Sequence, residues 1–563
     1  MLRTAATVTW IVMVGSLVAV SVHGQATWYE TSFFLLHEDH HTSGRFEVGR
    51  DADPEQINEL LTALSPDTIQ IHAKGNPGWT TYPSHVGYTP PKLARDVLGL
   101  WRDLARQNNF YWSIYYNIGR DGEIMQRHPE WNRDVADGRE QDKALCYHSG
   151  VADAYIWPML EEIIRGYDPD GFWFDGSVFT VRVCYCAACR QRFRAEQGAD
   201  LPTVPDAPKW HEFHEMQRAI YREFVAATCR RIHMQKPSCL TTFNWAYSLR
   251  MPEKPDPQIA YLTGDIGNHV EGLSAEAHWY DGTGLPFDLM TTGHTSAAND
   301  DGRAQRIPKP RPQLEQEMAV IIANGGRYNL WDNPSPTSRI DPVLLRHHSR
   351  VVTPFLRARQ PWCVATQRVP DVSILHSAAA HYSLAERGEM PFKRQNNRID
   401  GLSQFLPQLH LNYEILGDWR LIAQDVRSPL LIVEHPRALS PPEINALLTF
   451  AEEGGQLLMT GMGLTLREDL PKDFGLNLLQ APVAAEALEI SLGGQSMALE
   501  HYLFRYAPAG CTVLAEARDR EGKVHPFLTR QVHGKGALWT LATPFFSAHG
   551  SNTPTLDLMR QVM

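Results

Sequence analysis

An aspartate at the end of an apolar stretch is well placed to do chemistry. Residues 171–175 read Gly-Phe-Trp-Phe-Asp, and Gly176 follows. The apolar residues predict a buried strand that fixes Asp175 at its end, and Gly176 lets the backbone turn away so that a ligand can approach. A carboxylate held there can attack an anomeric carbon or support an oxocarbenium ion. The alternative is an aspartate that caps the following turn.

A carboxylate nucleophile needs a proton donor, and retaining glycosidases place the two carboxyls about 5 Å apart. Glu276 ends a second apolar stretch, residues 272–276, beside a His and a Trp. These neighbours would desolvate Glu276 and raise its pKa, as an acid requires, so we expect it to be the acid/base. Glu271 and Glu38 are rival candidates. The alternative role for Glu276 is a structural ion pair with an arginine.

A cysteine cluster follows the Asp175 strand. Cys184, Cys186 and Cys189 have Cys-x-Cys-x-x-Cys spacing, and Cys146 lies upstream. This spacing brings three thiolates together in one turn, which suits tetrahedral zinc with Cys146 as the fourth ligand. A disulfide is the alternative in an exported protein, although three closely spaced cysteines cannot all pair among themselves. We expect a structural zinc that stiffens the loop behind Asp175.

These residues need a scaffold, and the chain from about residue 30 to 360 alternates short apolar stretches with helical ones. Strands are expected at 33–36, 68–73, 111–116, 171–175, 240–243, 272–276, 288–291 and 328–331, and helices at 54–64, 91–106, 154–166, 210–234, 313–324 and 342–359. This alternation of strands and helices over about 300 residues predicts a (β/α)8 barrel. A doubly wound sheet is the alternative, but no Gly-x-Gly-x-x-Gly turn follows the first strand.

Polar and aromatic residues collect just after these expected strands. In a barrel, the carboxyl ends of the strands carry the active site, whereas loops are also polar for general reasons. A His-rich segment, residues 37–41, follows the first strand; we favour hydrogen bonds to a sugar there over a metal site. The residues expected to bind substrate are His37, Lys74, Asn76, Trp79, Asn117, Trp173, Asn244, Trp279 and Trp331.

A second unit begins near residue 369. Strands are expected at 372–375, 430–433 and 457–460, helices at 402–409 and 441–453, and a strand-rich segment after about residue 480. This pattern predicts an α/β domain of the flavodoxin or glutamine-amidotransferase type. An amidotransferase needs a nucleophilic Cys on a strand-to-helix elbow, and Cys511 is outside any such elbow. We therefore expect this domain to be non-catalytic and to mediate a homo-oligomer.

Composition excludes several classes of protein. The chain has 563 residues, 43% of them hydrophobic, and a formal net charge of −11. It is too apolar for a disordered protein and has no basic cluster for nucleic acid. Residues 1–26 resemble a signal peptide, with Arg3 before an apolar run, so we expect a periplasmic or secreted protein; an uncleaved membrane anchor is the alternative. No later stretch is apolar enough to span a bilayer.

Two segments carry a family resemblance. Residues 170–176 resemble the nucleophile strand of α-L-fucosidases, and residues 72–79 resemble their second-strand segment. From about residue 30 to 540 the chain is similar to glycoside hydrolase family 151, whose members join a barrel to a β-galactosidase trimerisation-like domain and are related to the family 29 fucosidases. A cysteine cluster similar to this one binds zinc in family 42 β-galactosidases.

The resemblance implies a catalytic barrel at 27–365 and an amidotransferase-like domain at 366–563. It further implies a retaining exo-α-L-fucosidase with Asp175 as nucleophile, His37 on the sugar hydroxyls and no catalytic cofactor. One departure matters: the better-known fucosidases carry a His pair where this chain has Gly75 and Asn76. Two alternatives therefore stay open, a glycosidase for another sugar such as a galactoside or arabinoside, and an inactive carbohydrate-binding protein.

Overall fold

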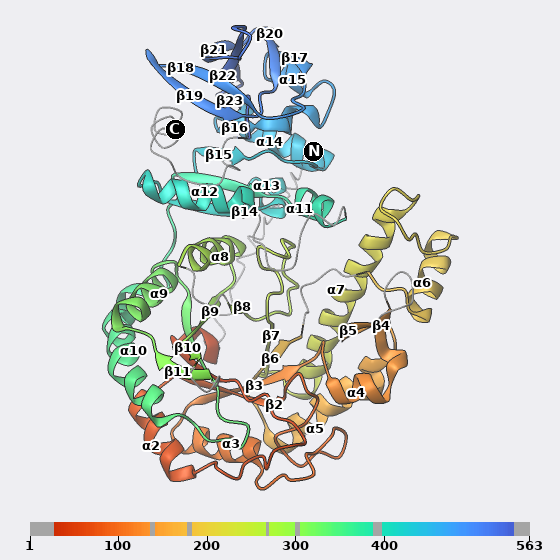
Figure 1. Cartoon of the computed structure of the whole chain (residues 1–563), viewed down its shortest axis with the longest axis vertical. Coiled ribbons are helices and arrows are strands. Elements are labelled where there is room, and N and C mark those ends of the chain that lie inside the picture. Colours follow the sequence, from red (N-terminus) through yellow and green to blue (C-terminus); the bar gives the residue numbers. More distant parts are fainter. Residues whose placement is uncertain are drawn as a thin grey trace, which may run out of the picture.

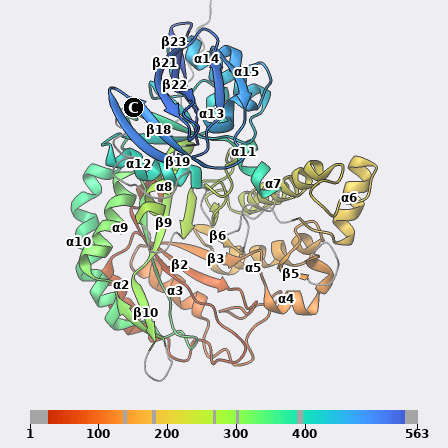
Figure 2. The same cartoon turned by 45° about the horizontal axis from the view of Figure 1, so that its top comes forward.

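The protein consists of a barrel with a second α/β domain stacked on it. The computed structural model describes residues 27–134, 141–176, 183–265, 270–298, 304–386 and 397–544. The expected signal peptide, residues 1–26, lies outside the described residues. Figure 1 shows the barrel in red to green and the second domain in cyan to blue above it, and Figure 2 shows the same stacking from another side. Among the described residues, no helix is long and apolar enough to cross a membrane.

Eight parallel strands form the barrel. Their hydrogen-bonded order is β7-β6-β3-β2-β1-β12-β9-β8. The two ends of this order are joined by the Trp245 amide, 3.2 Å from the Thr263 carbonyl, and by the Thr242 hydroxyl, 2.7 Å from the Tyr261 carbonyl. The expected (β/α)8 barrel is thereby confirmed over the doubly wound sheet. The strands are β1 (Phe34–Glu38), β2 (Thr68–Lys74), β3 (Tyr111–Asn117), β6 (Gly171–Asp175), β7 (Leu240–Phe243), β8 (Leu262–Asp265), β9 (Phe287–Thr292) and β12 (Arg327–Asp332).

Helices surround these strands, as Figure 1 shows. Helix α2 (Pro54–Leu64) illustrates why they form. Asp53 caps it by accepting from the Glu55 and Gln56 amides, Pro54 starts it, and its apolar residues at helical spacing are buried. The other helices of this ring are α3 (Val97–Gln107), η2 (a π-helix, Ala152–Ile156), α5 (Trp157–Tyr167), α7 (Trp210–Gln235), α8 (Val270–Thr283), α9 (Arg311–Ala323) and α10 (Pro342–Cys363).

Smaller elements decorate the barrel. An antiparallel pair, β10 (His294–Ala298) and β11 (Ala304–Pro308), follows β9, and a second pair, β4 (Asn132–Asp134) and β5 (Gln141–Leu145), follows β3. The remaining helices are α1 (Trp28–Thr31), α4 (Gly122–Arg127), η1 (Pro129–Trp131) and α6 (Ala187–Gln197). The β4–β5 pair and α6 bring together the two segments that carry the cysteine cluster.

One expected strand is a helix. Residues 272–276 lie in α8, and the sixth strand of the barrel is β8, Leu262–Asp265. Helix α8 is buried on nearly every side because it lies between the barrel and the second domain, where His278 stacks on Tyr413 at 3.8 Å between ring centroids. An all-round apolar helix cannot be distinguished from a buried strand by a short apolar run. Strand β8 contains Gly and Thr, so its apolar signal is weak.

The second domain is built on a nine-stranded sheet of order β14-β13-β15-β16-β23-β22-β21-β18-β19, parallel from β14 to β23 and antiparallel beyond. The expected α/β domain with a strand-rich end is confirmed. Its strands are β13 (Val372–His376), β14 (Tyr413–Gly417), β15 (Leu430–Val433), β16 (Gln456–Thr460), β18 (Glu486–Leu492), β19 (Gln495–His501), β21 (Thr512–Arg518), β22 (Val524–His533) and β23 (Gly536–Leu541), with a separate pair β17 (Leu476–Gln480) and β20 (Arg505–Pro508).

Helices cover this sheet: α11 (Ala378–Ala385), α12 (Asn397–Gln408), α13 (Asp418–Ile422), α14 (Pro441–Glu452), α15 (Leu470–Asp473) and the 3-10 helix η3 (Gly461–Thr465). Helix α14 begins with a capping box. The Glu443 backbone amide donates to the Ser440 side chain, and the Ser440 backbone amide donates to the Glu443 side chain. The boundary expected between residues 365 and 366 falls between α10, the last barrel helix, and β13.

Candidate active site

Asp175 ends β6 at the carboxyl face of the barrel and is half-buried. Its Oδ2 accepts a hydrogen bond from the Tyr115 hydroxyl at 2.6 Å, and its Oδ1 accepts one from Asn244 Nδ2 at 3.1 Å. Gly176 adopts φ +107°, and a Cβ there would lie 2.2 Å from Asn117 Oδ1. Glycine is therefore required at the turn that leaves the Asp175 carboxyl reachable from the barrel mouth.

A second carboxyl faces Asp175 across the β7–β8 seam. Asn244, directly after β7, also donates its Nδ2 to Asp265 Oδ1 at 3.2 Å. Because one nitrogen reaches both carboxyls, the two bonded oxygens are at most about 6.3 Å apart. This upper limit is compatible with the about 5–5.5 Å spacing of retaining glycosidases. Asp265 ends β8, so both carboxyls lie at strand ends.

The surroundings of Asp265 favour its protonated form. Desolvation and the neighbouring Asp175 raise the pKa of Asp265 to about 7, although hydrogen bonds from Asn244 and Trp245 act in the opposite direction. The carboxyl is nonetheless exposed at the strand end. A carboxylic acid that keeps its proton near neutral pH, beside a carboxylate, is the arrangement that acid/base catalysis needs.

The expected acid/base, Glu276, is not at a strand end. It lies on α8, is 1% exposed, and its Oε1 accepts the Leu249 backbone amide at 2.8 Å. Buried in this way, Glu276 supports the loop between β7 and β8. Of its rivals, Glu38 ends β1 with its side chain fully buried, and Glu271 is exposed in the first turn of α8.

A histidine cluster held by Asp39 lies beside Asp175. Asp39 Oδ1 is 2.7 Å from His72 Nε2, 2.9 Å from His41 Nε2 and 3.9 Å from His37 Nε2. Burial works against its ionisation, but the three histidines hold the pKa of Asp39 well below its usual range. His37 also lies 5.4 Å from the Trp173 ring between centroids. Imidazoles and a carboxylate that converge at the barrel mouth suit sugar hydroxyls.

Three members of this cluster lie close enough together to hold a metal ion. Ligand atoms of His37, Asp39 and His72 all lie within 4.8 Å of one another. However, within the described part of the chain His72 Nδ1 has no hydrogen-bond partner, whereas metal-bound histidines donate their second ring nitrogen to an outer partner. This donor set fits hydroxyl groups better than a resident ion.

His41 fills the space beside Gly75. A Cβ on Gly75 would lie 2.5 Å from His41 Nδ1, and the Asn76 amide donates to that nitrogen at 3.1 Å. The His41 imidazole, from the loop after β1, therefore occupies the space that a side chain at position 75 would fill. Despite burial, Asp39 and Asp175 raise the pKa of His41.

The expected polar residues form one chain of contacts. Asn76 and Asn117 are hydrogen-bonded to each other, and Asn117 Nδ2 lies 2.9 Å from the Tyr115 hydroxyl, which reaches Asp175. Lys74 lies beneath them: it is 1% exposed and pairs with Asp121 at 2.7 Å. Lys74 is thus in contact with the Asn117 carbonyl and an ion-pair partner, and it is covered from substrate.

The expected tryptophans divide into two groups. Trp173 and Trp331 pack with Tyr115 and Met290 inside the mouth of the barrel, and Trp79 is half-buried against Gly44. Trp279 is fully buried on α8 and donates its indole N–H to the Tyr247 carbonyl at 2.6 Å. Trp279 therefore lies under the β7–β8 loop and offers no surface to a sugar.

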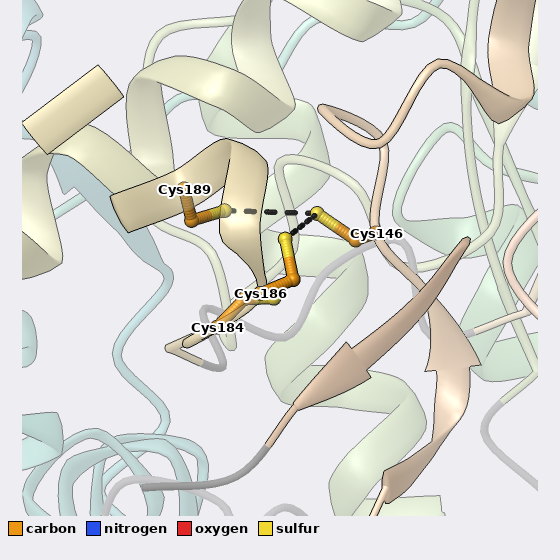
Figure 3. A group of neighbouring side chains, drawn as sticks. All are labelled: Cys146, Cys184, Cys186 and Cys189. Atoms are coloured by element: carbon orange, nitrogen blue, oxygen red, sulfur yellow. Dashed lines mark hydrogen bonds between the residues drawn. The ribbon is translucent and has the colours of Figure 1, made fainter. Parts of the chain in front are cut away.

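The four clustered cysteines meet beside the barrel (Figure 3). All four are buried, and their sulfurs lie within 4.8 Å of one another, with Cys146 Sγ 3.6 Å from Cys186 Sγ and 3.7 Å from Cys189 Sγ. A disulfide needs about 2.05 Å, and each of these thiols is free. Sulfurs around zinc at about 2.3 Å would be about 3.8 Å apart. The donor set therefore fits tetrahedral zinc.

Asp265, His72 and Tyr115 are site residues that sequence reasoning missed, whereas Asp39 and His41 lie in the segment 37–41 that was expected to bind sugar but were not named individually. Asp265 ends a short strand that the apolar pattern does not mark. The histidines and Asp39 lie in segments already noted, but only the fold shows that the loop after β1 turns back over β2.

Comparisons with known proteins bear on the fold. No protein-family model matches the chain, and no curated protein matches it. Among solved structures, α-L-fucosidase isoenzyme 2 from Paenibacillus thiaminolyticus superposes with a TM-score of 0.79 at 18% identity, covering 94% of this chain and 83% of that one. The β-galactosidase from Bacillus circulans sp. alkalophilus gives 0.71 at 13% identity, covering 94% and 88%.

The exo-β-1,4-mannosidase Op5Man5 from Opitutaceae bacterium strain TAV5 gives a TM-score of 0.60 at 12% identity, covering 94% of this chain and 93% of that one. The chain thus has the two-domain fold of these glycosidases: a (β/α)8 barrel followed by an α/β domain. Within that fold it places a carboxyl pair, a histidine cluster and an aromatic wall at the barrel mouth.

Proposed function

We propose that the protein is a retaining glycoside hydrolase in which Asp175 is the nucleophile and Asp265 the acid/base. The observation that carries this proposal is the pair of carboxyls at the ends of β6 and β8, bridged by Asn244. Their separation is compatible with the retaining spacing, and their environments differ in the way that two roles require. The likeness to solved glycosidases supports the same class.

The reaction proceeds in two displacements. Asp175 attacks the anomeric carbon while the bond to the leaving oxygen breaks, and Asp265 gives its proton to that oxygen. The glycosyl group is then an ester on Asp175. The Asp265 carboxylate next takes a proton from water, whose oxygen attacks the anomeric carbon and releases Asp175. Tyr115 and Asn244 orient the nucleophile through their hydrogen bonds to its two oxygens.

An α-L-fucoside is the substrate that we favour. The partly exposed His41 and Asp39 form a polar side for ring hydroxyls, and the partly exposed Trp331, packed on Trp173 and Met290, forms an apolar side. A 6-deoxy sugar presents hydroxyls and a methyl group, which such a two-sided site can bind together. The likeness to a solved α-L-fucosidase supports this choice, and His41 supplies an imidazole next to Gly75.

A panel of nitrophenyl glycosides tests the proposal. We expect fucoside hydrolysis that falls by at least about 10²-fold in Asp175→Gly and Asp265→Gly. Added azide should restore activity to both variants and give different products. The Asp175 variant should form a glycosyl azide of inverted anomeric configuration, and the Asp265 variant one of retained configuration. Hydrolysis of a galactoside or arabinoside instead would keep the mechanism and change the sugar. Sugar binding without turnover would identify an inactive binding protein.

We also propose a structural zinc, export and assembly into a homo-oligomer. A structural zinc on Cys146, Cys184, Cys186 and Cys189 is consistent with the donor set described above, and catalysis would need no cofactor. Export rests on residues 1–26, and a homo-oligomer through the domain at 366–563 rests on the sequence resemblance. Mass analysis of the mature N-terminus and light scattering test the last two.

A further inference from the structure

The loop between β7 and β8 carries two groups that touch the carboxyl pair. Asn244 bridges Asp175 and Asp265, and Trp245 donates a hydrogen bond to Asp265. The loop backbone is strained, because Trp245 has φ +64° and Tyr247 has φ +57°. Non-glycine residues in this region cost of order 1 kcal/mol or more each, and persist where surrounding contacts impose them. The loop therefore needs restraints from outside itself.

Part of that restraint comes from the second domain. His376, the last residue of β13, places Nε2 2.8 Å from the Leu249 carbonyl, and His381 on α11 places Nε2 3.0 Å from the Arg250 carbonyl. A carbonyl only accepts, so each Nε2 carries the proton. Burial lowers the pKa of His376 to about 4 and that of His381 well below its usual range. Both histidines are thus neutral donors at neutral pH.

A continuous chain of contacts leads from these histidines to the active site. The Arg250 guanidinium lies 3.8 Å from the centre of the Trp245 ring, and Trp245 reaches Asp265. From the barrel side, Glu276 and Trp279 hold the Leu249 amide and the Tyr247 carbonyl. His376 also meets the Trp279 ring edge-on, at 5.2 Å between centroids. The loop is therefore held between α8 and the second domain.

We propose that the second domain is a working part of the active site, in which His376 and His381 are positioning residues that hold the β7–β8 loop and so keep Trp245 against Asp265. The proposal rests on the role of Asp265 given under the proposed function. It assigns the second domain a task in catalysis beyond any part in assembly.

The test replaces the histidine donors. His381→Leu and His376→Leu remove the hydrogen bonds to the loop, whereas His381→Gln and His376→Gln keep an N–H donor. We expect kcat/KM to fall at least about tenfold in each Leu variant and to recover largely in each Gln variant. We also expect the basic limb of the kcat/KM profile to move to higher pH in the Leu variants, because Asp265 loses the donor that favours its carboxylate.

His348→Leu is the matched control. His348 is equally buried, its pKa is lowered to about 4, and its Nε2 lies 2.9 Å from the Gly293 carbonyl, but it lies on α10 away from the loop. This variant should lose stability and keep the basic limb of the wild type. A basic limb in His381→Leu that is unchanged, or lowered, would overturn the proposal.

Two further measurements keep the test decisive. If the Leu variants do not fold, Arg250→Gln removes the stack on Trp245 without changing the second domain, and it should produce the same upward shift of the basic limb. Backbone amides of residues 245–251 should exchange hydrogen faster in His381→Leu than in the wild type. The increase should be smaller in His381→Gln. If the wild type hydrolyses no glycoside, the proposed function fails, while exchange still reports whether the histidines hold the loop.

Discussion

The Tyr115 side chain joins the nucleophile to the histidine cluster. Its hydroxyl lies 2.6 Å from Asp175 Oδ2, and its ring stacks on His72 with centroids 3.5 Å apart and planes 5° from parallel. Burial and the charge of Asp175 raise the pKa of Tyr115 well above its usual value, so the hydroxyl remains a donor at every working pH. One residue thus contacts both the proposed nucleophile and the histidine cluster.

Removing this hydroxyl separates the two tasks. In Tyr115→Phe the ring still stacks on His72, but Asp175 loses a hydrogen bond worth about 1.5–3 kcal/mol for a charged acceptor. We expect kcat to fall about 10- to 100-fold with little change in KM, measured on a nitrophenyl fucoside. A KM that rises while kcat is kept would contradict the assignment, because it would place Tyr115 in sugar binding alone.

The pH profile should report Asp265. Its pKa is raised to about 7, and an acid catalyst works only when protonated, so kcat/KM should fall as the pH rises through about 7. Asp265→Asn should lose this basic limb, and its rate loss should reach about 10²- to 10⁴-fold for poor leaving groups, which need the proton most. Glu276→Gln is the control: it should retain the limb. If Glu276→Gln abolished the limb instead, Glu276 would be the acid.

Gly176 offers a steric test. Gly176→Ala places a methyl 2.2 Å from Asn117 Oδ1 in addition to its positive φ. Gly284→Ala provides the comparison, because Gly284 has φ +82° and an added Cβ would meet nothing within 4 Å. Both variants should lose about 1 kcal/mol of stability through strain at positive φ. Gly176→Ala should lose more, because its Cβ would also lie 2.6 Å and 2.8 Å from the backbone nitrogens of Gly119 and Arg120. Only Gly176→Ala should also lose most of its kcat/KM, and equal activities would show that the turn tolerates a side chain.

Metal analysis tests the cysteine cluster. We expect one zinc per chain, lost on prolonged chelation together with a clear drop in Tm, since structural zinc contributes directly to folding. Cys189→Ser should behave like the chelated protein. Cys229→Ser, which alters a buried thiol bonded to Thr241 outside the cluster, should keep its zinc. A metal-free wild type with an unchanged Tm would refute the zinc assignment.

Much of the fold could be predicted because the elements repeat simple patterns. Helix α2 begins at Pro54 and ends at Leu64 as expected, since Asp53 and Pro54 mark its start and its apolar residues recur at helical spacing. Most barrel strands were equally evident as short apolar runs between helices. The exception arose where α8 is buried by the second domain, because that burial depends on tertiary packing and leaves no periodic signature.

The candidate site could be predicted only in part. Asp175 was evident because an apolar strand, a carboxylate and a glycine follow one another. Asp265 was not, because β8 includes Thr263 and Gly264 and reads as a loop. Trp279 and Lys74 show the opposite error: both follow apolar stretches, yet their side chains point into the protein. Which way a side chain faces depends on register, and sequence spacing alone does not give it.

The carboxyl pair spans the seam where the hydrogen-bonded order of the barrel ends, with Asp175 on β6 and Asp265 on β8. Neither half of the barrel holds both groups. Turnover should therefore appear only when the β7–β8 seam has closed during folding, because only then can Asn244 contact both carboxyls. In a refolding experiment, the recovery of activity would then report when the ring closes, whereas spectroscopic signals report collapse.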